Sequence, residues 1–228
     1  MKCTIIFPCL NESDSIGMSV IQAWNILKYH EIDGEIIVVD NGSTDNSAYV
    51  VKSLQNEYNN LHYAHEEKKG YGNAYLKGLS LAKGKYIIMV DPDGSYDLTM
   101  IPRFLFHLEQ NDLVVGNRFA NIKKGAMPFI NRYFWNNLLR MLLHSKGLEL
   151  EETCTGFIGV HKSFIDSLNL KSEGMEFSTE LLVKSHDGFS DVEEIPITYH
   201  CRVGRSKVMK FQDGMRHLKY LLSTEKYI

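Results

Sequence analysis

Residues 87–97 read IIMVDPDGSYD, an apolar run that gives way to three carboxylates at Asp91, Asp93 and Asp97. The apolar run is typical of a buried strand, and the acidic residues begin where that strand would end. Carboxylates at this spacing repel one another, and burying an unpaired carboxylate costs several kcal/mol or more. The stretch therefore predicts either a solvated turn or a place where a positive group lies between the carboxylates. We interpret Asp97 as a helix N-cap or first-turn charge.

Short apolar runs alternate with helical patterns on both sides of this stretch. The strands expected in the first half are residues 3–10, 35–40, 61–66, 85–91 and 112–118. The helices expected between them are residues 15–29, 45–58, 72–84 and 98–109. The alternation predicts an α/β fold with a mostly parallel central sheet and helices on both faces.

The second half has a less regular pattern. We expect helices at residues 128–145, 176–188 and 211–222, and strands at residues 153–162 and 192–200. No repeat, low-complexity tract or Pro/Gly/Ser-rich linker interrupts the chain. A single domain over residues 1–228 is the economical interpretation.

Composition narrows the class of protein. The chain has 228 residues, 44% of them hydrophobic and 23% charged, which indicates a globular protein with a buried core. The formal net charge of −3 gives no general electrostatic reason to expect a nucleic-acid partner.

The cysteines and the first residues indicate the compartment. No C-x-x-C pair occurs, so we interpret the cysteines as reduced thiols, which fits a reducing cytosol. The four cysteines are Cys3, Cys9, Cys154 and Cys201. The sequence shows no signal-peptide cleavage pattern and no run of roughly 18 apolar residues that could span a bilayer. We therefore expect a cytoplasmic protein, with peripheral contact at a membrane surface left open.

Polar clusters follow three of the expected strands. The first strand leads into Asn11 and Glu12, the second ends in Asp40, and the fourth ends in Asp91 and Asp93. Each cluster alone could be ordinary turn chemistry, because Asp and Ser readily bond local backbone groups. In open parallel sheets, however, ligands bind at the carboxyl ends of the strands, so the three clusters together predict a ligand site.

An Asp-x-Asp at a strand end suits a divalent cation. Mg²⁺ and Mn²⁺ prefer hard oxygen ligands and usually keep positions for water and substrate phosphate. Such a cation would offset the repulsion between Asp91 and Asp93 and would stabilise charge on a departing diphosphate. We therefore expect Mg²⁺ or Mn²⁺ as cofactor.

The chain resembles the inverting family 2 glycosyltransferases of the GT-A fold, in the branch of the dolichyl-phosphate mannose and glucose synthases. The matching stretches run almost end to end along the chain in the order and spacing of that branch. They are FPCLNES, VVDNGSTDNS, KKGYGNAYLKGL, MVDPDGSYD, GNRF, GAMPFINRYFWN, TGFIGV, GMEFSTELLVK, EIPITYH and GRSKVMKFQDGMRHLKYLL.

The resemblance implies a donor site made of residues from the first half. The residues implied to line the base and ribose pocket are Pro8, Asn11, Glu12 and Asp40. Lys69 and Gly70 are implied to close over the nucleotide, and Asp91 and Asp93 to bracket the metal and the diphosphate. Relatives often carry Gln two places after the second Asp, where this chain has Ser95, so a metal role for Ser95 is left open.

Four arginines are candidates to bind phosphate, because the guanidinium presents a fixed fork of donors. They are Arg118, Arg132, Arg202 and Arg205. The resemblance implies a catalytic role for Arg118 and donor binding by Arg202 and Arg205. Arg132 and Asn136 lie one turn apart and are implied to face an acceptor phosphate. The alternative is an ordinary amphipathic helix with a solvated basic face.

Glu176 and Glu180 lie one turn apart at the start of an expected helix. Acidic residues in a first turn are favoured by the helix dipole, which is the structural explanation. The functional explanation makes one of them a general base or an acceptor-positioning carboxylate. A sugar hydroxyl needs such a base, whereas a phosphate is already an anion, so the acceptor decides whether either glutamate is essential.

The C-terminal segment combines basic and apolar residues. It predicts either a helix that completes the fold or a helix that rests on an anionic membrane, where each basic residue is worth about 1 kcal/mol.

Together these observations predict a metal-dependent inverting glycosyltransferase. Residues 1–118 would bind a UDP- or GDP-linked sugar, and residues 119–228 would bind the acceptor, a polyprenyl phosphate of the dolichyl type. Two alternatives stay open: transfer to a soluble sugar or glycan hydroxyl, and a nucleotide-sugar-binding module without turnover.

Overall fold

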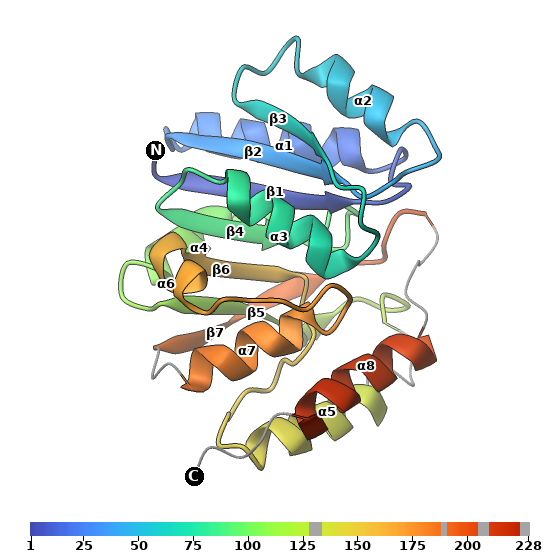
Figure 1. Cartoon of the computed structure of the whole chain (residues 1–228). Helices are drawn as coiled ribbons and strands as arrows, with labels where there is room; N and C mark the ends of the chain where they lie inside the picture. Colours follow the sequence, from blue (N-terminus) through green and yellow to red (C-terminus); the bar gives the residue numbers. More distant parts are fainter. Residues whose placement is uncertain (128–133, 188–190, 205–209, 224–228) are drawn as a thin grey trace.

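A twisted central sheet organises the molecule (Figure 1). The computed structural model describes residues 1–127, 134–187, 191–204 and 210–223. Within these residues the sheet has seven strands in the order β3-β2-β1-β4-β6-β5-β7. The strands are β1 (Cys3–Cys9), β2 (Gly34–Asp40), β3 (Leu61–His65), β4 (Tyr86–Val90), β5 (Leu113–Ile122), β6 (Phe157–His161) and β7 (Val192–Tyr199).

Most strand pairs are parallel, which confirms the expected α/β fold. The exception is β6, which is antiparallel to both of its neighbours, β4 and β5. The expected division of the chain near residue 118 falls inside β5, a strand that pairs with both β6 and β7.

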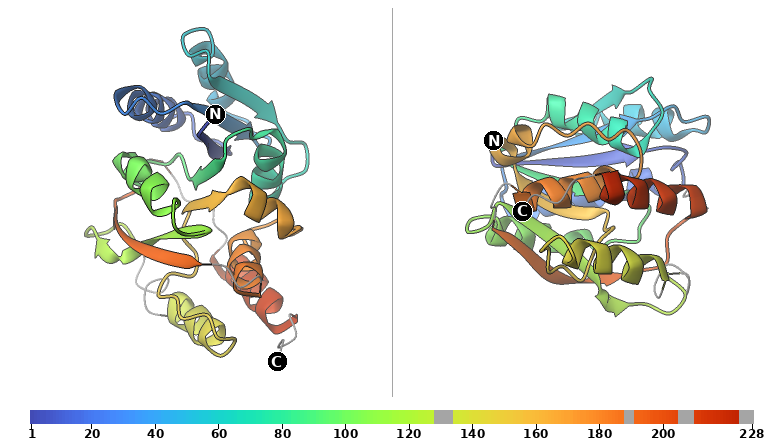
Figure 2. Two further views of the ribbon diagram at one scale, coloured as in Figure 1. Left: turned by 90° about the vertical axis from the view of Figure 1, so that its left-hand side faces the viewer. Right: turned by 60° about the horizontal axis from the view of Figure 1, so that its bottom comes forward.

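Helices cover both faces of the sheet, as the alternating pattern predicts. One face carries α1 (Ile16–Tyr29), α2 (Ser47–Leu54) and α4 (Ile101–His107), and the other carries α3 (Tyr71–Leu81), α6 (Lys162–Ser167) and α7 (Phe177–Asp187). The helices α5 (Asn136–His144) and α8 (Lys210–Ser223) lie side by side at one end of the molecule (Figures 1 and 2).

The two cores arise because neighbouring residues of a strand point to opposite faces of a sheet. In β1, Ile5 packs into the core beneath α1, whereas Ile6 packs into the core beneath α3 and α7. Both side chains are completely buried.

Several boundaries differ from the expected ones. Helix α3 ends at Leu81, three residues before the expected stop at Gly84, because Ala82 is extended. The freed backbone groups bond to the sheet: the amide of Lys83 donates to Glu35 Oε1 at 2.7 Å and that of Gly84 to Thr4 Oγ1 at 2.8 Å. The helix expected at 128–145 begins in residues outside the described ranges, and its described part is α5.

The expected cap at Asp97 is confirmed. The carboxylate of Asp97 accepts a hydrogen bond from the amide of Thr99 at 3.0 Å and begins a short 3₁₀ helix, η1 (Leu98–Met100), which leads into α4. None of the helices in the described ranges has both the length and the apolar content needed to cross a membrane.

The order of the strands creates a switch point between β1 and β4. From β1 the chain moves outward to β2 and β3, and from β4 it moves to the other half of the sheet. Ligands of open α/β sheets bind at the carboxyl ends of the strands that flank such a point. The segments that follow β1 and β4 carry Glu12 and the pair Asp91 and Asp93.

Candidate active site

A cleft of about 370 Å³ opens beside the segment that follows β4. Its charged lining includes Asp91 and Asp93 together with the two arginines Arg118 and Arg202. Large apolar side chains also line it, namely Phe119, Met127, Trp135, Leu139 and Met175. The cleft therefore combines acidic, basic and apolar groups contributed by both halves of the chain.

Asp91 is held between the start of α3 and Gly156, the residue before β6. Its Oδ1 accepts a hydrogen bond of 3.0 Å from the hydroxyl of Tyr71, the first residue of α3. Its carboxylate lies directly over Gly156, where any Cβ would come within 2.1 Å of Asp91 Oδ2. Burial, and next the neighbouring charge of Asp93, raise the pKa of Asp91 to about 7.

Asp93 is bonded on both carboxylate oxygens. The amide of Ser95 donates to Oδ1 at 2.9 Å, and the Ser95 hydroxyl donates to the same oxygen. Oδ2 lies 3.4 Å from a guanidinium nitrogen of Arg202. Ser95 is completely buried, and its hydroxyl supports the carboxylate of Asp93.

Arg202 joins the segments that follow β1, β4 and β7. Besides Asp93 it contacts Glu12, with 3.0 Å between Nη2 and Glu12 Oε1. The Nε of Arg202 is buried and has no partner among the described residues. The guanidinium of Arg202 thus links the carboxylates of Glu12 and Asp93 at the switch point.

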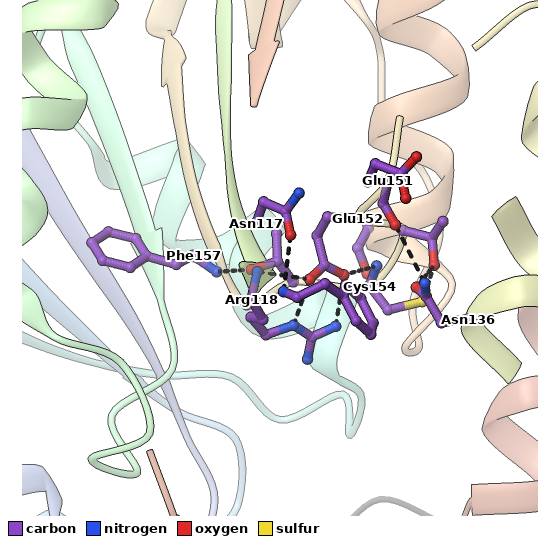
Figure 3. Close-up of polar contacts among 12 residues, drawn as sticks. Asn117, Arg118, Asn136, Glu151, Glu152, Cys154 and Phe157 are labelled. Atoms are coloured by element: carbon purple, nitrogen blue, oxygen red, sulfur yellow. Dashed lines mark hydrogen bonds and ion pairs between the residues drawn. The ribbon is translucent and has the colours of Figure 1, made fainter. Parts of the chain in front are cut away.

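Arg118, which lines the cleft, forms a short ion pair with Glu152 (Figure 3). Its Nε and Nη2 each donate to one Glu152 oxygen at 2.7 Å. The guanidinium also lies 5.3 Å from the ring centre of Tyr199. Burial by itself lowers the pKa of Arg118, but the charge and hydrogen bonds of Glu152, together with Tyr96 and Tyr199, outweigh it and hold that pKa well above its usual value. Arg118 is therefore a fixed cation in the wall of the cleft.

The other predicted donor residues gather at the ends of β1 and β2. Pro8 is buried within β1. Asn11 has a left-handed backbone (φ 52°), and its Oδ1 accepts from the Thr44 amide at 2.6 Å. Asp40 is buried; its two oxygens accept from the Ser43 amide at 3.0 Å and from the Tyr63 hydroxyl at 2.9 Å. Asn11 and Asp40 therefore form a second polar region along the same edge of the sheet.

Lys69 and Gly70 lie in the segment that leads into α3. The Gly70 amide donates to Asn41 Oδ1 at 2.6 Å, which ties this segment to the end of β2. Gly70 has φ 147°, and a Cβ there would meet the carbonyl oxygen of Glu173 at 2.1 Å. The Lys69 side chain is exposed.

The predicted acceptor residues are described in part. Asn136, the first residue of α5, lines the cleft and accepts a hydrogen bond of 2.8 Å from Thr153 Oγ1. Its side-chain nitrogen donates to the Glu151 carbonyl at 3.3 Å (Figure 3). Arg132 and Arg205 lie outside the described residues, so their predicted roles stay predictions.

Glu180 organises the loop before α7. Its carboxylate accepts from the Lys171 amide at 3.0 Å and the Ser172 amide at 2.6 Å, and it pairs with Lys184 at 2.7 Å. Burial alone raises the pKa of Glu180, but these bonds more than offset it and lower that pKa below its usual value. Such a carboxylate is poorly suited to accept a proton.

Glu176 is the less engaged of the two glutamates. Its Oε1 accepts from the Gly174 amide at 3.2 Å. Its Oε2 is buried without a partner among the described residues. The described lining of the cleft includes Met175 and Ser178, the neighbours of Glu176, but neither Glu176 nor Glu180.

A family model described as glycosyl transferase family 2 matches residues 4–168, which is more than half of the chain. The chain belongs to glycosyl transferase family 2. This confirms the resemblance drawn from the motifs, and the matched range contains Asp91, Asp93, Arg118 and Glu152.

Two curated relatives of this family 2 chain come from archaea. The low-salt glycan biosynthesis hexosyltransferase Agl6 of Haloferax volcanii is 29% identical over 223 residues, covering 96% of this chain and 52% of that protein. The dolichol-phosphate mannosyltransferase of Pyrococcus furiosus is 22% identical over 233 residues, covering all of this chain and 64% of that protein. The chain thus spans between half and two thirds of the length of these relatives.

Among solved structures, glucosyl-3-phosphoglycerate synthase from Mycobacterium tuberculosis is similar. Its complex with Mn²⁺, UDP and glucosyl-3-phosphoglycerate superposes with a TM-score of 0.76 at 18% identity, covering 97% of this chain and 79% of that chain. At this level of identity the similarity shows a shared fold, and it confirms the expected GT-A architecture.

Two residues that the sequence reasoning missed now stand out. Glu152 is the partner of Arg118, and Tyr71 holds Asp91. Glu152 lies in a polar stretch with no periodic pattern, and Tyr71 begins an ordinary helix, so neither had a local signal. Glu152 is completely buried in the folded chain, and its burial indicates an ion-pair partner, because buried charges are seldom unpaired.

The acidic pair fits a divalent cation. Asp91 Oδ2 accepts no hydrogen bond from the described residues, and Asp93 Oδ2 makes an ion pair of 3.4 Å with Arg202. The described residues contain no cluster of three or more His, Cys, Asp or Glu side chains that could enclose a metal. Mg²⁺ and Mn²⁺ do not require such a cluster, because one or two carboxylates, water and substrate phosphate complete their coordination.

Proposed function

We propose that this family 2 chain transfers a sugar from a nucleotide diphosphate sugar to a polyprenyl phosphate, with inversion and with Mg²⁺ or Mn²⁺. One observation carries the proposal: Asp91, Asp93, Arg118 and Arg202 line one cleft beside the switch point of the sheet. Two acids and two arginines match a metal-bound diphosphate, which carries negative charge and needs both a cation and hydrogen-bond donors.

Different residues would bind the cation, the diphosphate and the nucleoside of the donor. Asp91 and Asp93 would hold the cation, which when bound would neutralise the charge of the leaving diphosphate. Arg118 and Arg202 would donate to the phosphate oxygens, since guanidinium groups pair well with phosphate. The residues at the ends of β1 and β2, including Asn11 and Asp40, would bind the nucleoside. Positioning of this kind accounts for much of the catalysis expected without a covalent step.

Two features favour a lipid-linked phosphate as the acceptor. The cleft has a large apolar lining, with Phe119, Met127 and Trp135 among it, which suits an isoprenoid chain better than a glycan. A phosphate nucleophile is already ionised and needs no general base, in keeping with the fully bonded carboxylate of Glu180. The curated relative named dolichol-phosphate mannosyltransferase points the same way.

A peripheral contact with a membrane surface is part of this proposal. The outer side of α8 carries exposed Met215 and Leu222 beside the exposed cations Arg216 and Lys219. On the adjacent α5, Met141 is 62% exposed. This mixture suits an anionic lipid surface. Flotation with vesicles of phosphatidylcholine, with and without phosphatidylserine, tests the contact, and equal recovery from both would contradict it. A cytoplasmic location stays a prediction.

The test begins with the donor. A thermal-shift panel of UDP- and GDP-sugars, with and without Mn²⁺, should show one donor that raises the melting temperature more when Mn²⁺ is present. Transfer is then measured to farnesyl phosphate and, as a matched control, to farnesol. Formation of glycosylated product with farnesyl phosphate but not with farnesol supports the proposal.

The outcomes separate the alternatives that the sequence left open. Transfer to farnesol or to a soluble glycan would favour a hydroxyl acceptor. Donor binding without any transfer would favour a binding module. Asp93→Asn should abolish transfer, whereas Asp97→Asn, which alters a helix cap in the same segment, should keep it. Full activity of Asp93→Asn at saturating Mn²⁺ would overturn the metal role.

A further inference from the structure

The hydroxyl of Tyr71 reaches Asp91 from outside the sheet. Tyr71 is the first residue of α3, and its hydroxyl donates to Asp91 Oδ1 at 3.0 Å. Both residues line the cleft. The bond connects a helix end with the segment after β4, which are separated by 20 positions in the chain.

This bond leaves the second oxygen of Asp91 available. Oδ2 receives no hydrogen bond from the described residues. Oδ2 lies over the Cα of Gly156. Only glycine leaves room for Oδ2 at this position, because a Cβ on residue 156 would lie 2.1 Å from it. The hydrogen bond to Oδ1 and the packing of the carboxylate against Gly156 together fix the plane of the Asp91 carboxylate. Oδ2 therefore points in one direction.

Tyr71 is itself held firmly. Its ring meets the ring of Tyr75 edge-on at 4.9 Å between centres, and Tyr75 in turn stacks on Phe177 of α7 at 5.5 Å. The start of α3 is anchored by the amide of Asn73, which donates to the Glu173 carbonyl at 3.1 Å. The hydroxyl of Tyr71 is therefore a preset donor rather than a mobile one.

We propose that Tyr71 is a positioning residue, whose hydroxyl orients Asp91 so that Oδ2 is presented to the cation and diphosphate of the donor. The inference rests on the proposed function. Residues that orient a metal ligand without touching the metal commonly change metal affinity roughly 10-fold to 100-fold when they are replaced.

Tyr75 provides a matched control. It lies one turn further along α3, and its hydroxyl is buried without a hydrogen-bond partner among the described residues. The void beside it measures about 10 Å³, no larger than about one water molecule. Tyr71→Phe and Tyr75→Phe each remove one phenol oxygen near Asp91 from the same helix, but only the Tyr71 hydroxyl makes a hydrogen bond to that carboxylate.

The experiment measures Mn²⁺ binding directly, by the loss of the free-ion electron paramagnetic resonance signal in the presence of UDP or GDP. Tyr71→Phe should weaken Mn²⁺ binding at least about 10-fold, whereas Tyr75→Phe should bind like the wild type. In transfer assays, Tyr71→Phe should raise the Mn²⁺ concentration for half-maximal rate and change kcat little. Gly156→Ala, which displaces the same carboxylate from its other side, should show the same weakened binding.

Three results would overturn the inference. Equal Mn²⁺ binding by Tyr71→Phe and Tyr75→Phe, with the wild type binding normally, would reject the positioning role and leave the proposed function intact. Loss of kcat without loss of Mn²⁺ affinity would reject it in the same way. A wild-type protein that binds no Mn²⁺ with either nucleotide would reject the proposed metal role together with this inference.

Discussion

The buried ion pair between Arg118 and Glu152 gives the sharpest prediction of stability. Glu152 has no exposed side-chain surface, and that of Arg118 is 12% exposed. Each Glu152 oxygen receives two donors: Oε2 accepts from Nε and the amide of Arg118, and Oε1 accepts from Nη2 of Arg118 and the amide of Cys154. All four donors converge on one carboxylate (Figure 3).

Glu152→Gln changes the charge and one oxygen while keeping the shape. Whichever carboxylate oxygen is replaced by the amide nitrogen of Gln, the two N–H groups that donated to that oxygen then face another N–H donor. The guanidinium of Arg118 also loses the negative charge that it was paired with. Breaking a buried ion pair from one side typically costs about 3–5 kcal/mol. For a chain of this length, each kcal/mol lowers the melting temperature by about 2–4 °C, so we expect a decrease of about 6–20 °C.

The assay is thermal and urea unfolding of Glu152→Gln beside Glu151→Gln. Glu151 is the adjacent residue, and its ion pair with Arg140 lies on the surface, where such pairs contribute about 0–1 kcal/mol. Replacing Arg118 and Glu152 together with Leu should recover much of the stability, because no charge is left unpaired, but it should not recover transfer. A loss below about 1 kcal/mol for Glu152→Gln would refute the reasoning, because it would mean that the pair is solvated or replaceable.

Two further predictions concern α7 and α8. Burial lowers the pKa of His217 to about 4, with a smaller opposing effect from Glu176, so between pH 6.5 and 4 the unfolded chain binds a proton that the folded chain does not. Unfolding free energy should therefore fall by about 3 kcal/mol as the pH drops through this window, and His217→Gln should show a flatter pH profile; equal slopes would contradict the burial of a neutral imidazole. Glu180→Gln should lower stability by about 1–3 kcal/mol through the loop at Lys171 and Ser172 while kcat stays within about tenfold of the wild type. A complete loss of kcat in a folded Glu180→Gln protein would instead support the role of general base.

Much of the fold was predictable because its signals are local. Apolar runs such as residues 85–91 and helical patterns such as residues 15–29 need no distant partner, and β4 and α1 form where they were expected. The ends of helices were less predictable. α3 stops early because Lys83 and Gly84 bond to Glu35 of β2 and Thr4 of β1, which are distant in sequence.

The sequence by itself determined that carboxylates crowd the ends of adjacent parallel strands, because strand periodicity and polar turn residues are read within a few positions. The tertiary structure decided which charges meet. Arg202 reaches Glu12 across 190 positions, Arg118 finds Glu152 across 34, and Tyr71 orients Asp91 from the start of a helix. It also gave Glu180 a full set of local partners, although the residue resembles a catalytic base in sequence. Pairing depends on distance in space and on burial, and both are set by how the sheet is ordered rather than by any local pattern.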